Sequence, residues 1–159
     1  MAVRQSAGIL LHRDAGAGPE LLLVHPGGPF WAKKDLGAWS IPKGEHGEEE
    51  DPRACALREL GEELGPAAPA LTEQELLELG SVKQKGGKLV RAWAAEAEFD
   101  PAELRSNAFE LEWPPRSGRR AEFPEVDRAE WFAPEEARRR ILPAQAPLID
   151  SLLDLYSRR

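Results

Sequence analysis

The sequence predicts an α+β fold in which a mixed β-sheet lies between helices. Apolar runs of strand length occur both before and after a helical segment near residue 52, so the strands are not confined to one part of the chain. A second helical pattern closes the sequence. No repeat, low-complexity tract or linker divides the sequence, and we expect residues 1–159 to form a single domain.

Three extended segments are expected before the first helix. Residues 6–12 (SAGILLH) and 20–25 (ELLLVH) are apolar runs on either side of the loop DAGAG, which predicts a hairpin. Residues 39–42 (WSIP) form a short extended piece. It leads into a loop in which Gly44 and Gly47 allow tight bends and close approach of the backbone to a ligand.

The first helix is expected to begin at Asp51-Pro52, because aspartate is a favoured N-cap residue and proline fits the first helical position. On a helical wheel with ~100° per residue, Leu60 and Leu64 fall within about 60° of Leu57. These leucines predict a face that packs on the core. The glutamates of the same helix fall on the opposite side.

The segment after this helix predicts four strands. Residues 78–84 and 88–98 flank Gly86-Gly87, a strong hairpin signal. Further short strands are expected at 109–113 (FELEW) and 128–132 (RAEWF).

Two helices are expected at the end of the chain. Residues 134–142 place acidic side chains first and arginines last, which suits the helix dipole. Residues 144–156 carry apolar side chains at helical spacing, and we interpret them as a core face: Leu148, Ile149, Leu152, Leu153 and Tyr156.

Composition restricts the possible classes of function. A hydrophobic content of 42% with 31% charged residues is typical of globular proteins. The net charge of −7 argues against non-specific nucleic-acid binding but does not exclude a small anionic ligand, because local patches matter more than the total. The single cysteine, Cys55, excludes an intramolecular disulfide, and we expect it to fill space. No apolar run is long enough for a membrane span or a signal peptide, so a cytoplasmic location is expected.

The most informative segment is 44–65 (GEHGEEEDPRACALRELGEELG), where Arg58, Glu59, Glu62 and Glu63 occupy one and a half helical turns. Spacings of three and four residues bring side chains onto one helix face, where like charges repel. Clustered carboxylates are ligands that magnesium and manganese prefer. The alternative is a solvated acidic helix face.

The spacing of this segment resembles the Nudix box. The matching positions are Gly44, Glu50, Arg58-Glu59-Leu60, Glu62-Glu63 and Gly65. One departure is Pro66, which stands where the family has an aliphatic residue, past the helix end where proline is common. The resemblance implies a MutT-like Nudix hydrolase of unresolved subfamily, with a Nudix α/β/α sandwich and a loop-helix-loop catalytic motif.

The resemblance also implies a metal site for Mg²⁺ or Mn²⁺. Glu62 and Glu63 would be the primary ligands, and Gly44 would offer its backbone carbonyl. Glu59 would be either a third ligand or the base that takes a proton from the attacking water. Such enzymes often add an acidic ligand from a later loop, for which we favour Glu125 over Glu122; the alternative is a surface acid.

The remaining box residues are expected to support these groups. Arg58 would orient a neighbouring glutamate through paired hydrogen bonds rather than touch substrate. Glu50 would either form a salt bridge with Arg58 or join the metal ligands. Gly65 would be structural.

Substrate contacts are expected from the loop ahead of the box. The candidates are Trp31, Lys33, Lys34 and Lys43. The Pro-Lys-Gly entry at 42–44 resembles that of family members that cleave diadenosine or inositol polyphosphates. Trp31 would stack on a base, or it would be a core or lid-packing residue. The tract 109–120 (FELEWPPRSGRR) is a second candidate for a substrate-side loop.

The function implied is metal-dependent hydrolysis of a phosphoanhydride bond in a nucleoside diphosphate linked to another group, and we favour a nucleoside or dinucleoside polyphosphate. The alternatives within the family are an ADP-sugar or RNA 5′ ends, and a non-catalytic nucleotide-sensing module. A structural protein with a plain acidic helix is a further alternative. Dimers are common in the family, so a homodimer is compatible with the resemblance.

Overall fold

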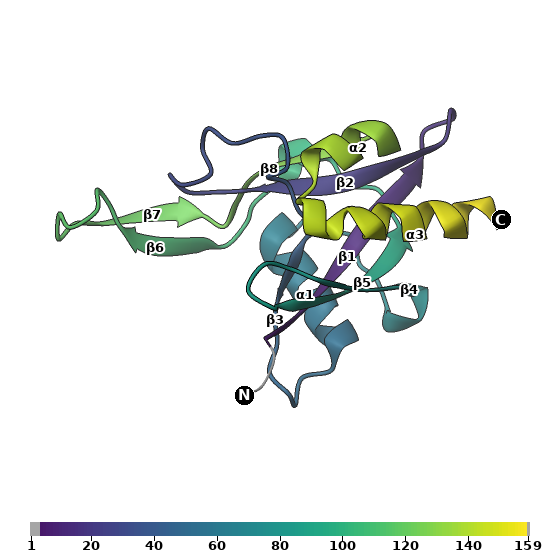
Figure 1. The fold of residues 1–159 in the computed structure, drawn as a ribbon, viewed down its shortest axis with the longest axis horizontal. Helices are drawn as coiled ribbons and strands as arrows, with labels where there is room; N and C mark the ends of the chain where they lie inside the picture. The colour runs from purple at the N-terminus through teal and green to yellow at the C-terminus, as the bar shows by residue number, and fades with distance from the viewer. Residues whose placement is uncertain (1–3, 159) are drawn as a thin grey trace.

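A computed structural model describes residues 4–158, and its main feature is a six-stranded mixed sheet (Figure 1). The strand order is β4-β5-β1-β2-β8, and β3 pairs with β1. The β1–β5 pair is parallel and the other pairs are antiparallel. The strands are β1 (Gln5–Asp14), β2 (Pro19–Pro26), β3 (Lys43–Glu45), β4 (Leu77–Lys83), β5 (Leu89–Glu96) and β8 (Val126–Phe132).

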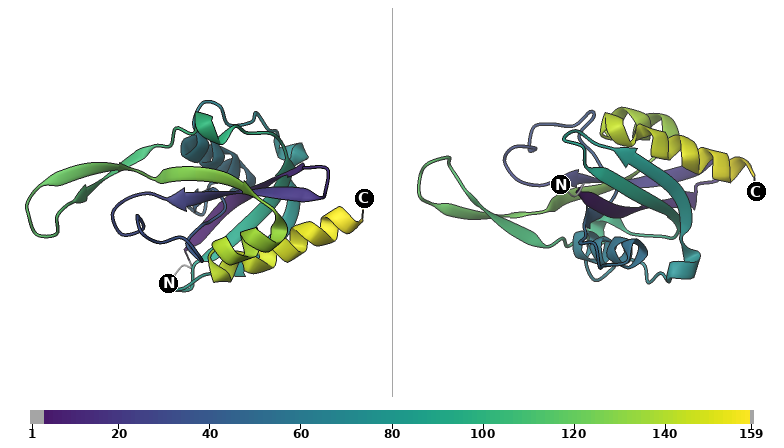
Figure 2. Two further views of the ribbon diagram at one scale, coloured as in Figure 1. Left: turned by 90° about the horizontal axis from the view of Figure 1, so that it is seen from above. Right: turned by 60° about the horizontal axis from the view of Figure 1, so that its bottom comes forward.

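Helices cover both faces of this sheet. Figure 2 (right) shows α1 on one face and the C-terminal helices on the other. The helices are α1 (Pro52–Leu64), α2 (Pro134–Arg140) and α3 (Ala146–Ser157). Short 3₁₀ turns lie between α1 and β4 (Glu73–Glu75), between β5 and β6 (Pro101–Glu103) and between α2 and α3 (Pro143–Gln145). The predicted α+β class, with a mixed sheet between helices, is therefore confirmed.

The core has two parts because side chains alternate along β1. Leu10 packs in the part that contains Leu148 and Leu152 of α3. Ile9 and Leu11 pack in the other part, against Leu60 of α1. This double burial explains why β1 appears in the sequence as a continuous apolar run rather than an alternating one.

The predicted hairpins and the start of α1 are confirmed. β1 and β2 pair across the loop after Asp14, and β4 and β5 pair across Gly86-Gly87, both of which have positive φ. Asp51 caps α1 by accepting a hydrogen bond from the Ala54 N–H at 3.0 Å, and Pro52 is the first helical residue. Within residues 4–158, no helix combines the length and apolar content that a membrane crossing requires.

Two segments differ from the prediction. Residues 39–42 make only isolated bridges, Val24 with Ser40 and Trp39 with Ile141, and the regular strand begins at Lys43. The tract after β6 (Ala108–Glu112) is not an open loop, because β7 (Arg120–Pro124) returns and pairs with β6. Figure 1 shows this two-stranded ribbon extending away from the body of the molecule.

Candidate active site

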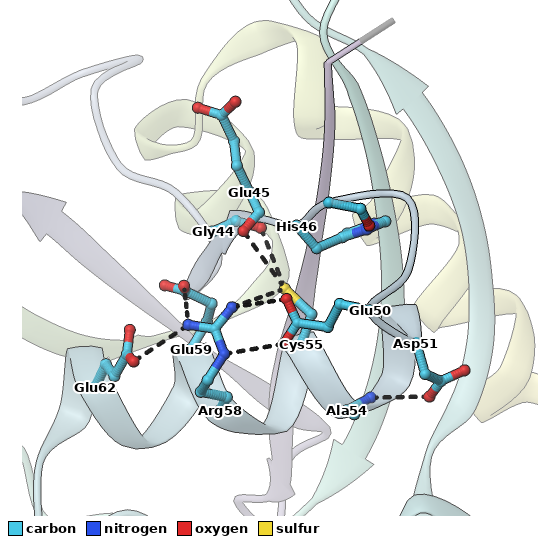
Figure 3. A network of polar contacts seen from close by, with 11 residues as sticks. Gly44, Glu45, His46, Glu50, Asp51, Ala54, Cys55, Arg58, Glu59 and Glu62 are labelled. Carbon is cyan, nitrogen blue, oxygen red and sulfur yellow. Dashed lines mark hydrogen bonds and ion pairs between the residues drawn. The ribbon is translucent and has the colours of Figure 1, made fainter. Parts of the chain in front are cut away.

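Arg58 is the centre of a polar network on α1 (Figure 3). Its Nε and Nη2 donate to the two carboxylate oxygens of Glu50, each at 3.0 Å. Its Nη1 donates to Glu59 at 2.9 Å and to Glu62 at 3.1 Å. Arg58 thus connects three carboxylates, and Glu50 takes the salt-bridge position, the first of its two expected alternatives.

Glu59 is held against the backbone of the preceding loop. It is 9% exposed, and a Cβ built on Gly44 would lie 2.0 Å from Glu59 Cδ. No atom can occupy that space without moving the carboxylate. Gly44 therefore forms a cradle for the Glu59 carboxylate, which explains why glycine is needed at this position.

Four carboxylates influence one another at the end of this network. Burial raises the pKa of Glu63 to about 8, although Lys43 opposes the shift. Burial and the charge of Glu62 raise the pKa of Glu59, and the same two causes raise the pKa of Glu125. The like charges and partial burial make the group unfavourable without a cation.

Glu125 reaches this cluster because backbone hydrogen bonds attach its segment to α1. The Asn107 N–H donates to the Glu62 carbonyl at 2.9 Å, and the Glu125 N–H donates to the Asn107 carbonyl at 2.8 Å. Glu122, the other acid considered, is exposed on β7 opposite Glu110. The structure thus places Glu125, and not Glu122, near the helix carboxylates.

The donor set fits a divalent cation in its chemistry. Oxygen ligands from carboxylates and a backbone carbonyl are those that Mg²⁺ and Mn²⁺ prefer. Among residues 4–158, no three His, Cys, Asp or Glu side chains are already grouped for metal binding. Glu59 and Glu62 each direct an oxygen to Arg58, and Glu63 accepts a hydrogen bond from the Lys43 N–H at 3.3 Å. Metal binding would therefore require these side chains to reorient toward a common point.

A cavity of about 400 Å³ adjoins the carboxylates. The charged residues that line it are Glu63, Glu125, Lys43 and Lys85. Its other lining residues are Val24, Pro26, Trp31, Ala38, Ser40, Ile41, Gln84, Val126 and Leu142. The volume is in the range of small-molecule sites, which are largely apolar with a few polar groups.

The predicted substrate contacts divide into two groups. Trp31 and Lys43 line the cavity, and burial lowers the pKa of the Lys43 ammonium. Lys33 and Lys34 are exposed on the loop and do not line it. Lys34 instead lies over the Trp31 ring, 5.0 Å from its centroid.

Gly65, at the end of α1, and Cys55, within it, both lie in closely packed parts of the structure. Gly65 ends the helix with φ of 92°, and a Cβ there would lie 2.4 Å from the Arg105 carbonyl oxygen. Cys55 is fully buried, and burial raises the pKa of its thiol to about 11. This agrees with a space-filling role for Cys55 rather than a nucleophilic one.

Sequence reasoning missed the polar residues of the cavity wall, Ser40, Gln84 and the buried Gln145 behind them. One signal was present. Gln145 is the second residue of the expected helix 144–156, beside apolar positions, and an amide buried there needs hydrogen-bond partners.

Comparison with known proteins gives the family. The family described as NUDIX domain matches residues 2–152. The chain belongs to the Nudix family. The expected Nudix-type pyrophosphohydrolase is thus confirmed at the level of the family, whose members generally use divalent metal ions. No match is found among curated proteins.

Solved structures share the fold over almost the whole chain. An Ap4A hydrolase from C. elegans in a binary complex has a TM-score of 0.66 and 21% identity, covering 99% of this chain and 100% of that one. The NUDIX domain of NrtR from Shewanella oneidensis, complexed with ADP ribose, has a TM-score of 0.65 and 16% identity, covering 98% and 90%. The ORF135 protein of E. coli has a TM-score of 0.62 and 21% identity, covering 100% and 94%. These similarities concern the fold.

Proposed function

We propose that this Nudix protein hydrolyses a phosphoanhydride bond in a nucleoside polyphosphate or dinucleoside polyphosphate, with Mg²⁺ or Mn²⁺. One observation carries the proposal. A single cavity is lined by the carboxylate residues Glu63 and Glu125 and also by Trp31 with apolar residues. A substrate with an anionic chain and a flat base is the kind of molecule that matches both sets of residues.

The carboxylate wall would hold the metal. Glu62 and Glu63 are the proposed primary ligands, with Glu125 and the Gly44 carbonyl beside them. When bound, a divalent cation would neutralise phosphate charge and lower the pKa of a coordinated water. Without it, an anionic substrate would be repelled by this wall.

Glu59 is proposed either as a further ligand or as the base for the attacking water. Partial burial and the charge of Glu62 raise its pKa, which makes the carboxylate a better proton acceptor than an ordinary glutamate. The water oxygen attacks phosphorus, the bridging P–O bond breaks, and two phosphate products leave. Arg58 positions Glu59 and Glu62 and does not line the cavity.

Lys43 would hold the phosphate chain, because it lines the cavity beside Glu63. Lys33 and Lys34 are exposed, and we propose that they act as an outer attraction for polyphosphate rather than as direct contacts. Trp31 would stack on the base.

Two of the similar structures favour nucleotide substrates. The C. elegans protein is an Ap4A hydrolase, and the NrtR domain was crystallised with ADP ribose. The second relative keeps an ADP-sugar as the alternative substrate class. A sensing module without catalysis is disfavoured because Glu59, Glu62 and Glu63 are all retained.

A substrate panel tests the proposal. The nucleotide and phosphate products should be separated by chromatography and measured for dinucleoside polyphosphates, nucleoside triphosphates, ADP-sugars and 5′-triphosphorylated RNA, each with and without divalent metal. We expect metal-dependent turnover, highest on one of the first two classes. No turnover on any compound, with nucleotide binding retained, would contradict the proposal and favour a sensor.

A further inference from the structure

A chain of hydrogen bonds runs behind the cavity wall and ends at Gln84. Gln145, at the end of the 3₁₀ turn before α3, is fully buried. Its Oε1 accepts from the Ile41 N–H at 3.1 Å. Its Nε2 donates to Ser40 Oγ at 3.0 Å and to Gln84 Oε1 at 2.7 Å. The chain therefore links the approach to β3, the start of α3 and the β4–β5 turn.

The direction of every bond in this chain follows from one backbone group. The Ile41 N–H can only donate, so the Gln145 atom that faces it must be the oxygen. The Gln145 amide nitrogen then faces Gln84, so the Gln84 atom it meets must also be the oxygen. The Ser40 hydroxyl donates to the Ile41 carbonyl at 2.8 Å and is left to accept from Gln145.

Once these donors and acceptors are assigned, the amide nitrogen of Gln84 is the last group of the chain to consider. Within residues 4–158 it has no hydrogen-bond partner, and Gln84 lines the cavity. Its neighbour Lys85 also lines the cavity, and a lysine ammonium can only donate. Gln84 and Lys85 therefore give this part of the lining two residues whose side chains can donate hydrogen bonds to a bound molecule.

Base edges differ in how they match two donors. The N7 and O6 atoms of guanine are both acceptors, whereas adenine presents the N7 acceptor beside the N6 amino donor. An amino group facing the Gln84 amide would leave two donors opposed inside a partly apolar cavity, which is unfavourable.

We propose that Gln84, together with Lys85, is a specificity-determining residue that selects guanine over adenine nucleotides. This proposal rests on the proposed nucleotide substrate. Gln145 is a positioning residue in it, because its buried amide prevents Gln84 from turning its oxygen toward the cavity. From the discrimination that a good paired contact gives, the preference is expected to be about 5- to 100-fold.

The test compares guanine and adenine nucleotides in wild type and two Gln84 variants. kcat/KM should be measured for GTP and ATP, and binding of GDP and ADP by calorimetry. In Gln84→Met the guanine preference should fall to about twofold or less, since the donor is lost but the shape is kept. In Gln84→Glu the carboxylate still accepts from Gln145 and offers an acceptor to the base, so the preference should move toward adenine. Gln74→Met is the matched control, because Gln74 is exposed and outside the cavity.

Three results would overturn the proposal: no guanine preference in wild type, an equal loss for both bases in Gln84→Met, or the same change in the Gln74 control. Calorimetry separates failure of the Gln84 proposal from failure of the proposed function. Binding that prefers GDP without hydrolysis would support the Gln84 proposal and contradict the enzyme. Binding of neither nucleotide would contradict both.

The positioning role of Gln145 has its own test. Gln145→Met should reduce the guanine preference although Gln84 is unchanged, and the double variant should show no further loss beyond Gln84→Met. Thermal unfolding identifies conditions in which each variant is folded. Additive losses in the double variant would contradict the positioning role.

Discussion

Gly44 is the residue at which a single methyl group has the most direct consequence for the site. In Gly44→Ala the new Cβ would lie 2.0 Å from Glu59 Cδ, so the carboxylate must move. We expect kcat to fall by about 100-fold, the effect of displacing a catalytic group by about 1 Å. Overpacking should also lower the free energy of unfolding by about 1–3 kcal/mol. Steady-state kinetics and urea unfolding measure the two effects.

Gly47→Ala is the control for this substitution. Gly47 lies in the same loop, and a Cβ there would meet nothing within 4 Å. We expect its kcat to stay within about twofold of wild type. Equal loss in both variants would show that loop flexibility, and not the Glu59 cradle, is what glycine provides.

Cys55 gives a prediction that depends on protonation. Burial, with smaller contributions from Glu50 and Glu59, raises the pKa of its thiol to about 11, so the thiolate is scarce at neutral pH. We expect native protein to resist alkylation by iodoacetamide until it is unfolded in urea, as measured by intact mass. Because Cys55 is the one cysteine in the sequence, any alkylated thiol reports on it alone. Rapid alkylation of the folded protein would contradict the buried, protonated state.

At the scale of elements, α1 is held to the sheet by its leucines. Leu60 is 1% exposed and packs with Ile9 and Leu11 of β1. Leu60→Ala should lower the free energy of unfolding by about 2–5 kcal/mol, the usual range for a buried leucine. Leu77→Ala, at a leucine that is 52% exposed, should change it by less than about 0.5 kcal/mol. Similar values in chemical denaturation would contradict the assignment of this helix face to the core.

Elements with strong local signals were predictable from sequence. Gly86-Gly87 predicted the β4–β5 hairpin because both positions take positive φ. β7 was not predicted, because its residues RAEFP contain little apolar sequence and pair only with β6 outside the main sheet. Its structure depends on a partner strand, which local propensity does not report.

At the scale of the whole molecule, the box was predictable but the cavity was not. The helix spacing brought Arg58 to Glu62 as i, i+4 neighbours, whereas its contact with the adjacent Glu59 does not follow from helix periodicity. The cavity walls come from segments far apart in sequence, such as Trp31, Gln84 and Glu125. Proximity in sequence does not predict which residues line the cavity. Lys33 and Lys34 are close to Trp31 in the chain but lie outside the cavity.

The central claim is that the carboxylates of α1 and Glu125 form a divalent-metal site that serves hydrolysis. Its most direct measurement is a manganese titration of wild type and Glu62→Gln/Glu63→Gln, with Glu122→Gln as the exposed acidic control. We expect the double variant to bind manganese more than about 100-fold more weakly, since losing a residue that only orients a ligand costs about 10- to 100-fold. The control should match wild type. Wild-type manganese affinity in the double variant would contradict the account.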